Sequence, residues 1–219
     1  MPIRKDFDHA LQELKELLID MGNRVEKALE LSVESLKNQD LQLANTIIHQ
    51  DREINQIEDK IIEVGSKLVA TQQPVAKDLR RILVAFKISS DLERMADLAV
   101  DIAKVTVRMG DEPLFKPLLD IPRMAEISQK MIKDAIFAYV TEDIDLAFKM
   151  AKDDDDVDHL YSQILREMYS FMAENPKHIS QAMLLSFVCR YIERIADHAT
   201  NIGESVVYLV VGKRPDLNS

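Results

Sequence analysis

The sequence predicts an all-α protein built from two tandem three-helix bundles. Apolar residues recur every three to four positions along most of the 219 residues, which is the spacing of amphipathic helices. Only 5 Gly and 7 Pro are present, so few residues interrupt these helices. The second half of the chain also repeats charged residues and turns of the first half, which indicates an internal duplication.

Turn residues divide the apolar pattern into six helices. Asn38-Gln39-Asp40 closes the first helix, and Pro74 ends the second because proline cannot continue the helical hydrogen bonds. We expect Asp40 to cap the second helix and either Thr141 or Asp143 to cap the fifth. The six helices are expected to end near residues 37, 70, 108, 139, 173 and 211. The expected units are a first bundle over 1–112, a second bundle over 113–212 and a flexible tail over 213–219.

Composition excludes several classes of function. The formal net charge is −10, which argues against nonspecific binding to DNA or RNA. The single cysteine, Cys189, excludes an intramolecular disulfide and a cysteine-based zinc site, and it favours a reduced, cytoplasmic setting. The apolar run over 206–211 is much shorter than the roughly 20 residues that cross a bilayer, so we expect no membrane insertion.

The duplication rests on matched residues rather than on generic helix periodicity. Residues 40–44 match 143–147 at an offset of 103, and Glu93–Asp97 matches Glu193–Asp197 at an offset of 100. Six of the eleven positions from 93 to 103 are identical at that offset. Apolar heptads alone would not reproduce shared charges and turns. The repeat is also too long for a solenoid, so two joined bundles are the natural architecture.

Carboxylates occupy positions where this pattern expects core residues. Glu93 interrupts the apolar face of the third helix, and Asp97 and Asp101 follow at successive helical turns. Residues four apart lie roughly 5–6 Å from each other at Cβ, so such carboxylates can share an ion or bridge two. The last helix repeats Glu193 and Asp197, with Asn201 in place of the third acid.

The second and fifth helices contribute Asp51 and Asp154, which are equivalent acids in line with core residues. A lone carboxylate among apolar residues is costly unless it is paired or bound to metal. Oxygen ligands of this kind suit Mg, Mn, Ca, Fe or Zn. In the alternative interpretation the acids lie at the edge of the core and form ion pairs with arginines. These are Arg80, Arg81, Arg94 and Arg194. His159 and His198, close in sequence to the acids, are weaker ligand candidates.

The motifs resemble the signature of the PhoU family over essentially the whole chain. The residues that carry the resemblance are Gln73-Pro74-Val75-Ala76-Lys77-Asp78-Leu79-Arg80-Arg81, then Asp91-Leu92-Glu93-Arg94-Met95-Ala96-Asp97, and the repeat Ile192-Glu193-Arg194-Ile195-Ala196-Asp197. Departures from the family pattern are Asn201 and the loss of the Gln-Pro-Val-Ala element from the second half.

The resemblance implies a noncatalytic cytoplasmic regulator, often a homodimer, that restrains phosphate uptake and the phosphate-starvation response. Its implied partners are the ATPase of the phosphate-specific ABC transporter and the phosphate-sensing histidine kinase. Its implied cofactors are divalent or ferric ions in multinuclear sites (Zn, Fe, Mn or Mg), with no organic cofactor. The expected metal ligands are Glu93, Asp97, Asp101, Glu193, Asp197, Asp51 and Asp154, and the expected partner contacts are Pro74, Asp78, Arg80, Arg94 and Arg194.

Two other functions fit the same residues. A helical adaptor that needs no metal would use the same bundles and would hold its acids in ion pairs. A carboxylate-bridged metalloenzyme would use the acids for chemistry, although the Glu-x-x-His pairs of ferritin-like diiron bundles are missing.

Overall fold

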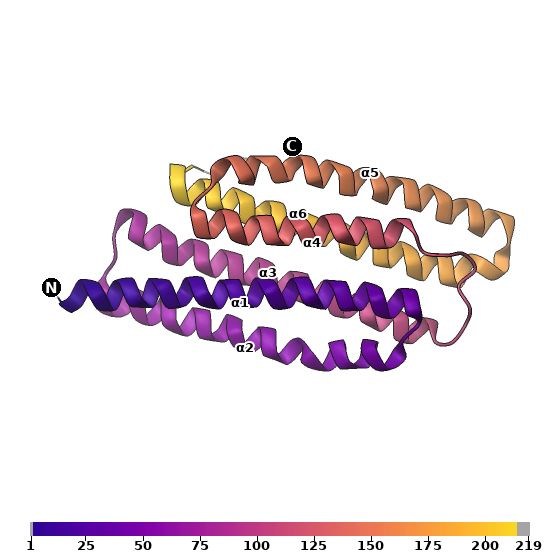
Figure 1. Ribbon diagram of the computed structural model, residues 1–219, viewed down its shortest axis with the longest axis horizontal. Coiled ribbons are helices and arrows are strands. Elements are labelled where there is room, and N and C mark those ends of the chain that lie inside the picture. The colour runs from indigo at the N-terminus through magenta and orange to yellow at the C-terminus, as the bar shows by residue number, and fades with distance from the viewer. Residues whose placement is uncertain (1, 214–219) are drawn as a thin grey trace.

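The computed structural model describes residues 2–213, and within that range it confirms two tandem three-helix bundles (Figure 1). Residues 214–219 of the expected tail lie outside the described residues. The elements are α1 (Pro2–Asn38), α2 (Leu41–Gln72), α3 (Ala76–Met109), α4 (Asp120–Thr141), α5 (Ile144–Glu174), the 3-10 turn η1 (Pro176–His178) and α6 (Ile179–Val211). No helix among these described residues is long and apolar enough to span a membrane.

Equivalent aspartates begin the second helix of each bundle. The Asp40 carboxylate accepts a hydrogen bond from the backbone N–H of Leu43 at 2.9 Å, and Asp143 accepts one from Leu146 at 3.0 Å. Asp143 is therefore the cap that the sequence left open, since Thr141 is the last residue of α4. These caps satisfy amide groups that the first helical turn leaves without partners.

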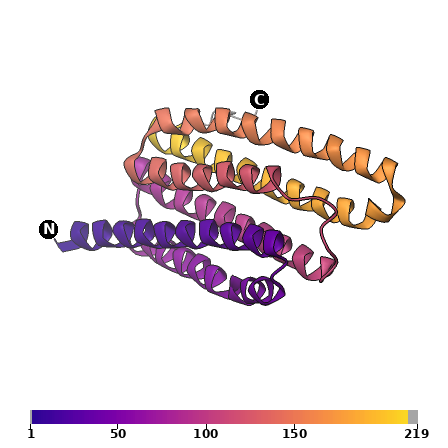
Figure 2. The same cartoon turned by 45° about the vertical axis from the view of Figure 1, so that its right-hand side comes forward.

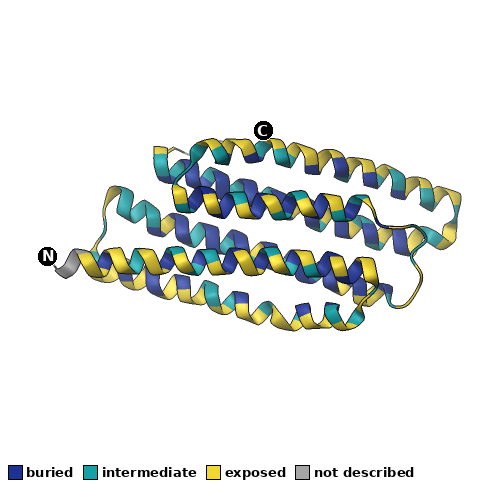
Figure 3. Ribbon diagram, in the orientation of Figure 1, coloured by how far each residue is buried: buried dark blue, intermediate teal, exposed yellow. Residues whose placement is uncertain are grey.

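The two bundles join along α3 and α6, which lie between α2 and α5 in both Figure 1 and Figure 2. Helix α1 also packs against α4, whereas among the described elements α2 and α5 contact only those of their own bundle. Burial follows this arrangement, because α3 and α6 carry the longest lists of buried residues and appear largely dark in Figure 3. The acid-bearing helices of the repeat thus form the centre of the molecule.

Within residues 5–213, one large hydrophobic core runs through both bundles. A second, smaller cluster lies apart from it in the first bundle and consists of Ala44, Ile47, Val100 and Ala103. The equivalent part of the second bundle, around Met150, belongs to the main core. The two bundles therefore share a fold without sharing the same packing.

Candidate metal centre

The first acidic group forms where α3 packs against α2. Glu93 is half-buried, with 19% of its side chain exposed, while Asp97 one turn later is 46% exposed. Burial raises the pKa of Glu93, and the nearby charges of Asp97 and Asp51 raise it further. Two helices therefore bring three of the expected metal ligands into one negative region.

Asp51 approaches this region from α2. Its Oδ1 is buried and has no hydrogen-bond partner, while Asn55 donates a long 3.4 Å bond to Oδ2. Burial and the charge of Asp97 both raise the pKa of Asp51. A buried carboxylate oxygen without a partner carries a desolvation cost that a bound cation would offset.

Glu58 is a member of the first group that the sequence analysis missed. Burial raises its pKa, and the nearby charge of Glu93 raises it further. It follows Asp51 by seven residues, which places it two helical turns along the same face. That spacing was the available signal, but Glu58 does not interrupt a run of core residues and so did not stand out.

Basic side chains neutralise part of the first group. Arg94 lies 3.5 Å from the Glu93 carboxylate and 3.6 Å from that of Asp97, which are long and exposed contacts. Lys104 binds Asp101 at 2.8 Å, so the structure engages Asp101 in an ion pair of its own. Arg94, one of the four arginines expected to form ion pairs with the acids, therefore pairs only weakly with the first group.

The carboxylates of the second acidic group have more strongly raised pKa values than those of the first. Burial, followed by the charge of Asp197, raises the pKa of Glu193 to about 7. The same two causes raise the pKa of Asp154 to about 6, although a hydrogen bond from Thr200 opposes the rise. Helices α5 and α6 thus assemble the equivalents of Asp51 and Glu93.

Arg190 partners Glu193 in this second group at 2.5 Å and leaves the other carboxylate oxygen, Oε2, buried without a partner. Arg190, rather than the expected Arg194, is therefore the arginine in contact with the acids. Asp158 also belongs here, because its charge raises the pKa of Asp197 and Glu193. The Asp158 side chain itself is exposed.

The two histidine candidates have other partners. His159 is exposed, and its Nδ1 lies 2.5 Å from the backbone oxygen of Asp155. His198 lies 3.0 Å from Asp91 of α3, which connects the two bundles. A positive charge on His198 would lower the pKa values of both Glu93 and Asp197, so the ring lies near both acidic groups.

Both groups offer the type of ligand atom that hard cations prefer, but their side chains are not arranged around a single ion position. Both groups offer carboxylate oxygens, and each contains a buried oxygen without a partner, on Asp51 and on Glu193. No three His, Cys, Asp or Glu side chains within the described residues are close enough together to hold a metal. Metal loading would therefore require side-chain movement, including release of Glu193 from Arg190.

The expected partner-contact element at the start of α3 connects the two bundles. Glu142, at the end of α4, accepts hydrogen bonds from Lys77 at 2.7 Å and from Arg81 at 3.2 Å. Burial alone would raise the pKa of Glu142, but these two bonds lower it below its usual value. Asp78 also binds Arg81, so three of the charged residues of the element, Lys77, Asp78 and Arg81, have partners within the chain.

Arg80 extends this connection to the end of α6. Its Nη1 would lie 2.9 Å from a Cβ added at Gly212, the residue that ends α6 with a positive φ of 81°. A guanidinium at this place also balances the negative end of the helix dipole. Pro74 is partly exposed just before α3, while Arg94 and Arg194 are exposed along the central helices.

Fold and site together define an all-helical protein with duplicated acidic groups, and comparisons with known proteins identify its family. The model of the PhoU domain matches residues 18–106 and again 121–206. A protein of Clostridium acetobutylicum, "Phosphate-specific transport system accessory protein PhoU homolog", is 42% identical and covers 98% of this chain and 99% of its own. An equally named protein of Aquifex aeolicus is 41% identical over 93% of this chain and 92% of its own.

Solved structures agree with these relatives. The crystal structure of PhoU from Pseudomonas aeruginosa matches with a TM-score of 0.90 and 36% identity, over 94% of this chain and all of the other. The phosphate transport system regulatory protein PhoU from Streptococcus pneumoniae matches with a TM-score of 0.89 and 28% identity, over 96% and 99% of the two chains. The chain belongs to the PhoU family of non-enzymatic regulatory proteins.

Proposed function

We propose that this protein is a metal-binding regulator of phosphate uptake that acts through protein contact. Its partners would be the ATPase of the phosphate-specific ABC transporter and the phosphate-sensing histidine kinase, both of which it would restrain. It would work in the cytoplasm as a homodimer. The names of the relatives in C. acetobutylicum and S. pneumoniae support the link to phosphate transport. Family membership sets aside the metalloenzyme alternative.

The observation that carries the metal proposal is the recurrence of buried acids at equivalent places in both bundles. Glu93, Asp97 and Asp51 would hold a cation in the first bundle, with Asp101 joining them on release from Lys104. Glu193, Asp197 and Asp154 would do the same in the second. A bound cation supplies positive charge that neutralises acids now held together against their mutual repulsion. Zinc, iron, manganese and magnesium all accept such ligands.

The metal proposal is tested by the metal content of protein purified without added metal or chelator. Glu93→Gln/Asp97→Asn and Glu193→Gln/Asp197→Asn should each lower the content, because each removes two charged ligands of one group. Asp155→Asn/Asp156→Asn, two exposed acids nearby, is the matched control. Equal metal in all four proteins would contradict the proposal.

A regulatory adaptor that needs no metal is the second candidate. The observation that favours it is that no three potential ligands in the described chain are gathered around one point. Under this alternative, partner binding survives treatment with a chelator. An affinity pull-down from phosphate-replete and phosphate-starved cells, with and without EDTA, separates the two candidates. Recovery of neither transporter nor kinase components in any condition would contradict both.

A further inference from the structure

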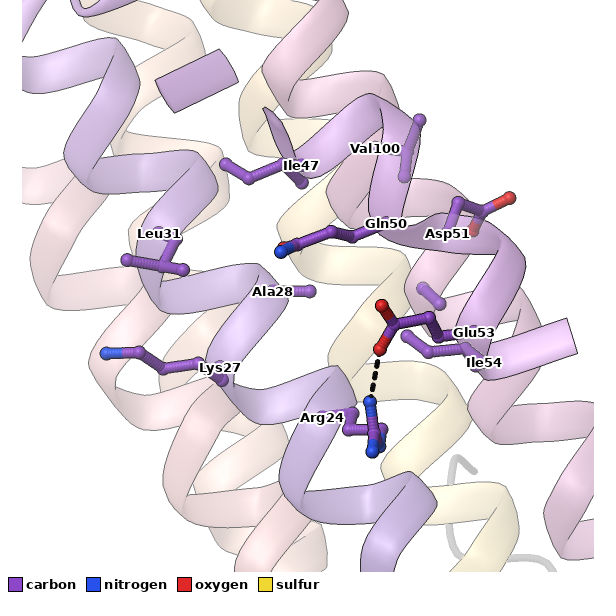
Figure 4. Close-up of a pocket in the computed structure, with 11 residues that line it drawn as sticks. Arg24, Lys27, Ala28, Leu31, Ile47, Gln50, Asp51, Glu53, Ile54 and Val100 are labelled. Carbon is purple, nitrogen blue, oxygen red and sulfur yellow. Dashed lines mark hydrogen bonds and ion pairs between the residues drawn. The ribbon is translucent and has the colours of Figure 1, made fainter. Parts of the chain in front are cut away.

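A cavity of about 190 Å³ lies in the first bundle between α1, α2 and α3 (Figure 4). It adjoins the small hydrophobic cluster around Ile47, which stands apart from the main core. Its apolar wall consists of Ala28, Leu31, Ile47, Ile54, Ala96 and Val100. The cavity is partly open to solvent, because exposed side chains such as Gln50 and Glu53 line its mouth.

One difference between the repeats lies in the wall of this cavity. The caps Asp40 and Asp143 set an offset of 103, and at that offset Ala28 corresponds to Met131. Met131 is fully buried, whereas Ala28 is only partly buried. The second bundle thus fills with a long flexible side chain the position that the first bundle leaves to a methyl group.

Polar groups surround the mouth of the cavity, and its two basic side chains are paired with acids. Arg24 binds Glu53 across the mouth at 2.6 Å, and Lys27 binds Glu30 at 2.7 Å. In Figure 4 the side chain of Gln50 extends from α2 toward Ala28. Within the described part of the chain the Gln50 amide has no hydrogen-bond partner, so it is available to a ligand.

We propose that this cavity binds a small neutral aromatic compound that carries one hydrogen-bonding group. An apolar cavity of about 150 Å³ is known to take up benzene, so a ring of roughly six to nine heavy atoms fits the available space. The mostly apolar wall, together with the pairing of Arg24 and Lys27, favours a neutral ligand over an ion. The Gln50 amide supplies the hydrogen bond that orients it. The ligand site is separate from the proposed metal ligands except where Asp51 lines the edge.

Phenol and toluene are the probes, each titrated into EDTA-treated protein so that metal binding does not enter. Methyl NMR should show saturable shifts confined to Leu31, Ile47, Ile54 and Val100. Phenol should bind roughly three- to tenfold more tightly than toluene because only phenol bonds to Gln50. Gln50→Leu should remove that preference while leaving toluene binding unchanged.

Ala28→Met is the decisive variant, since it fills the cavity with the side chain that the second bundle already uses. It should weaken both probes at least tenfold, whereas Ala10→Met, elsewhere on α1, should leave them unchanged. The absence of saturable binding to wild-type protein, shifts outside the cavity, or unchanged binding in Ala28→Met would each overturn the proposal. If Ala28→Met does not fold, the location of the wild-type shifts decides the question.

Discussion

Nδ1 of His198 on α6 lies 3.0 Å from Oδ1 of Asp91 on α3, and this pair connects the two bundles at the centre of the molecule. Asp91 is almost fully buried, with 3% of its side chain exposed, and Lys87 also binds it at 3.1 Å. At the offset of 100 between the repeats, His198 corresponds to Leu98 and Asp91 corresponds to Tyr191. The duplication therefore does not produce a second copy of this polar contact.

Removing either member of the Asp91–His198 pair should destabilise the protein. His198→Ala and Asp91→Asn should each lower the free energy of unfolding by roughly 1–3 kcal/mol, because the first removes one partner of a buried carboxylate and the second removes the charge that strengthens the contact. Urea denaturation of both variants and of the double variant measures the coupling between them. His159→Ala, at an exposed histidine, serves as the control and should stay within about 0.5 kcal/mol. Additive effects in the double variant would contradict a direct interaction.

Stability of the metal-free protein should fall as pH rises from about 4.5 to about 7. The pKa of Glu193 is raised to about 7 in the folded chain, so the folded state binds more protons than the unfolded state across this range. The expected loss from Glu193 is roughly 2–3 kcal/mol. Denaturation midpoints of EDTA-treated protein across this pH range measure it.

Glu193→Gln should flatten this pH profile, since glutamine does not titrate. Metal, if bound, should reverse the trend, because protons compete with cations for the same carboxylates below about pH 7. A wild-type profile that is already flat between pH 4.5 and 7 would show that Glu193 is not perturbed as the structure indicates.

Mn²⁺ should bind the second acidic group before the first. Glu193 and Asp154 have the most strongly raised pKa values of the acids, and deeper burial strengthens their attraction to a cation. Lys104, which neutralises the first group, is replaced by Glu204 at the equivalent position. Paramagnetic broadening of NMR signals at substoichiometric Mn²⁺ should therefore begin around α5 and α6. Broadening that starts around α2 and α3 would reverse the predicted order.

Gly65→Ala should destabilise the first bundle by roughly 1 kcal/mol. An added Cβ would lie 2.3 Å from Cε1 of Phe86, so the ring must move. The clash is expected to exceed the gain of about 0.5–1 kcal/mol that alanine brings to a helix. Thermal and urea denaturation measure the change. Combining it with Phe86→Leu should recover part of the loss, whereas equal loss in both backgrounds would rule out the clash.

Much of the fold was predictable because its signals are local. Asp40 and Asp143 cap helices through atoms three residues away, and Pro74 and Pro176 end helices by chemistry of their own. The apolar repeat predicted which face of each helix is buried. The interruption of that repeat by Glu93 and Glu193 identified the candidate site before any contact was known.

Other features depend on which helices meet, and periodicity along one helix carries no such information. The pairing of Arg81 with Glu142 joins residues 61 positions apart, so no local pattern predicts it. The choice of Arg190 over Arg194 as the partner of Glu193 depends on side-chain direction within the packed bundle. Glu58 was missed for the same reason, because its relation to Glu93 exists only across α2 and α3.

The amino-acid sequence by itself determined the helix boundaries, the duplication and the positions of the candidate acids, because each depends on residue chemistry at fixed spacing. The pKa values of those acids depend on the tertiary structure, because burial and charges from neighbouring helices set them. The tertiary structure also decided that Ala28 leaves a cavity where Met131 fills the core. Packing of this kind depends on volumes contributed by three helices at once, which no single stretch of sequence specifies.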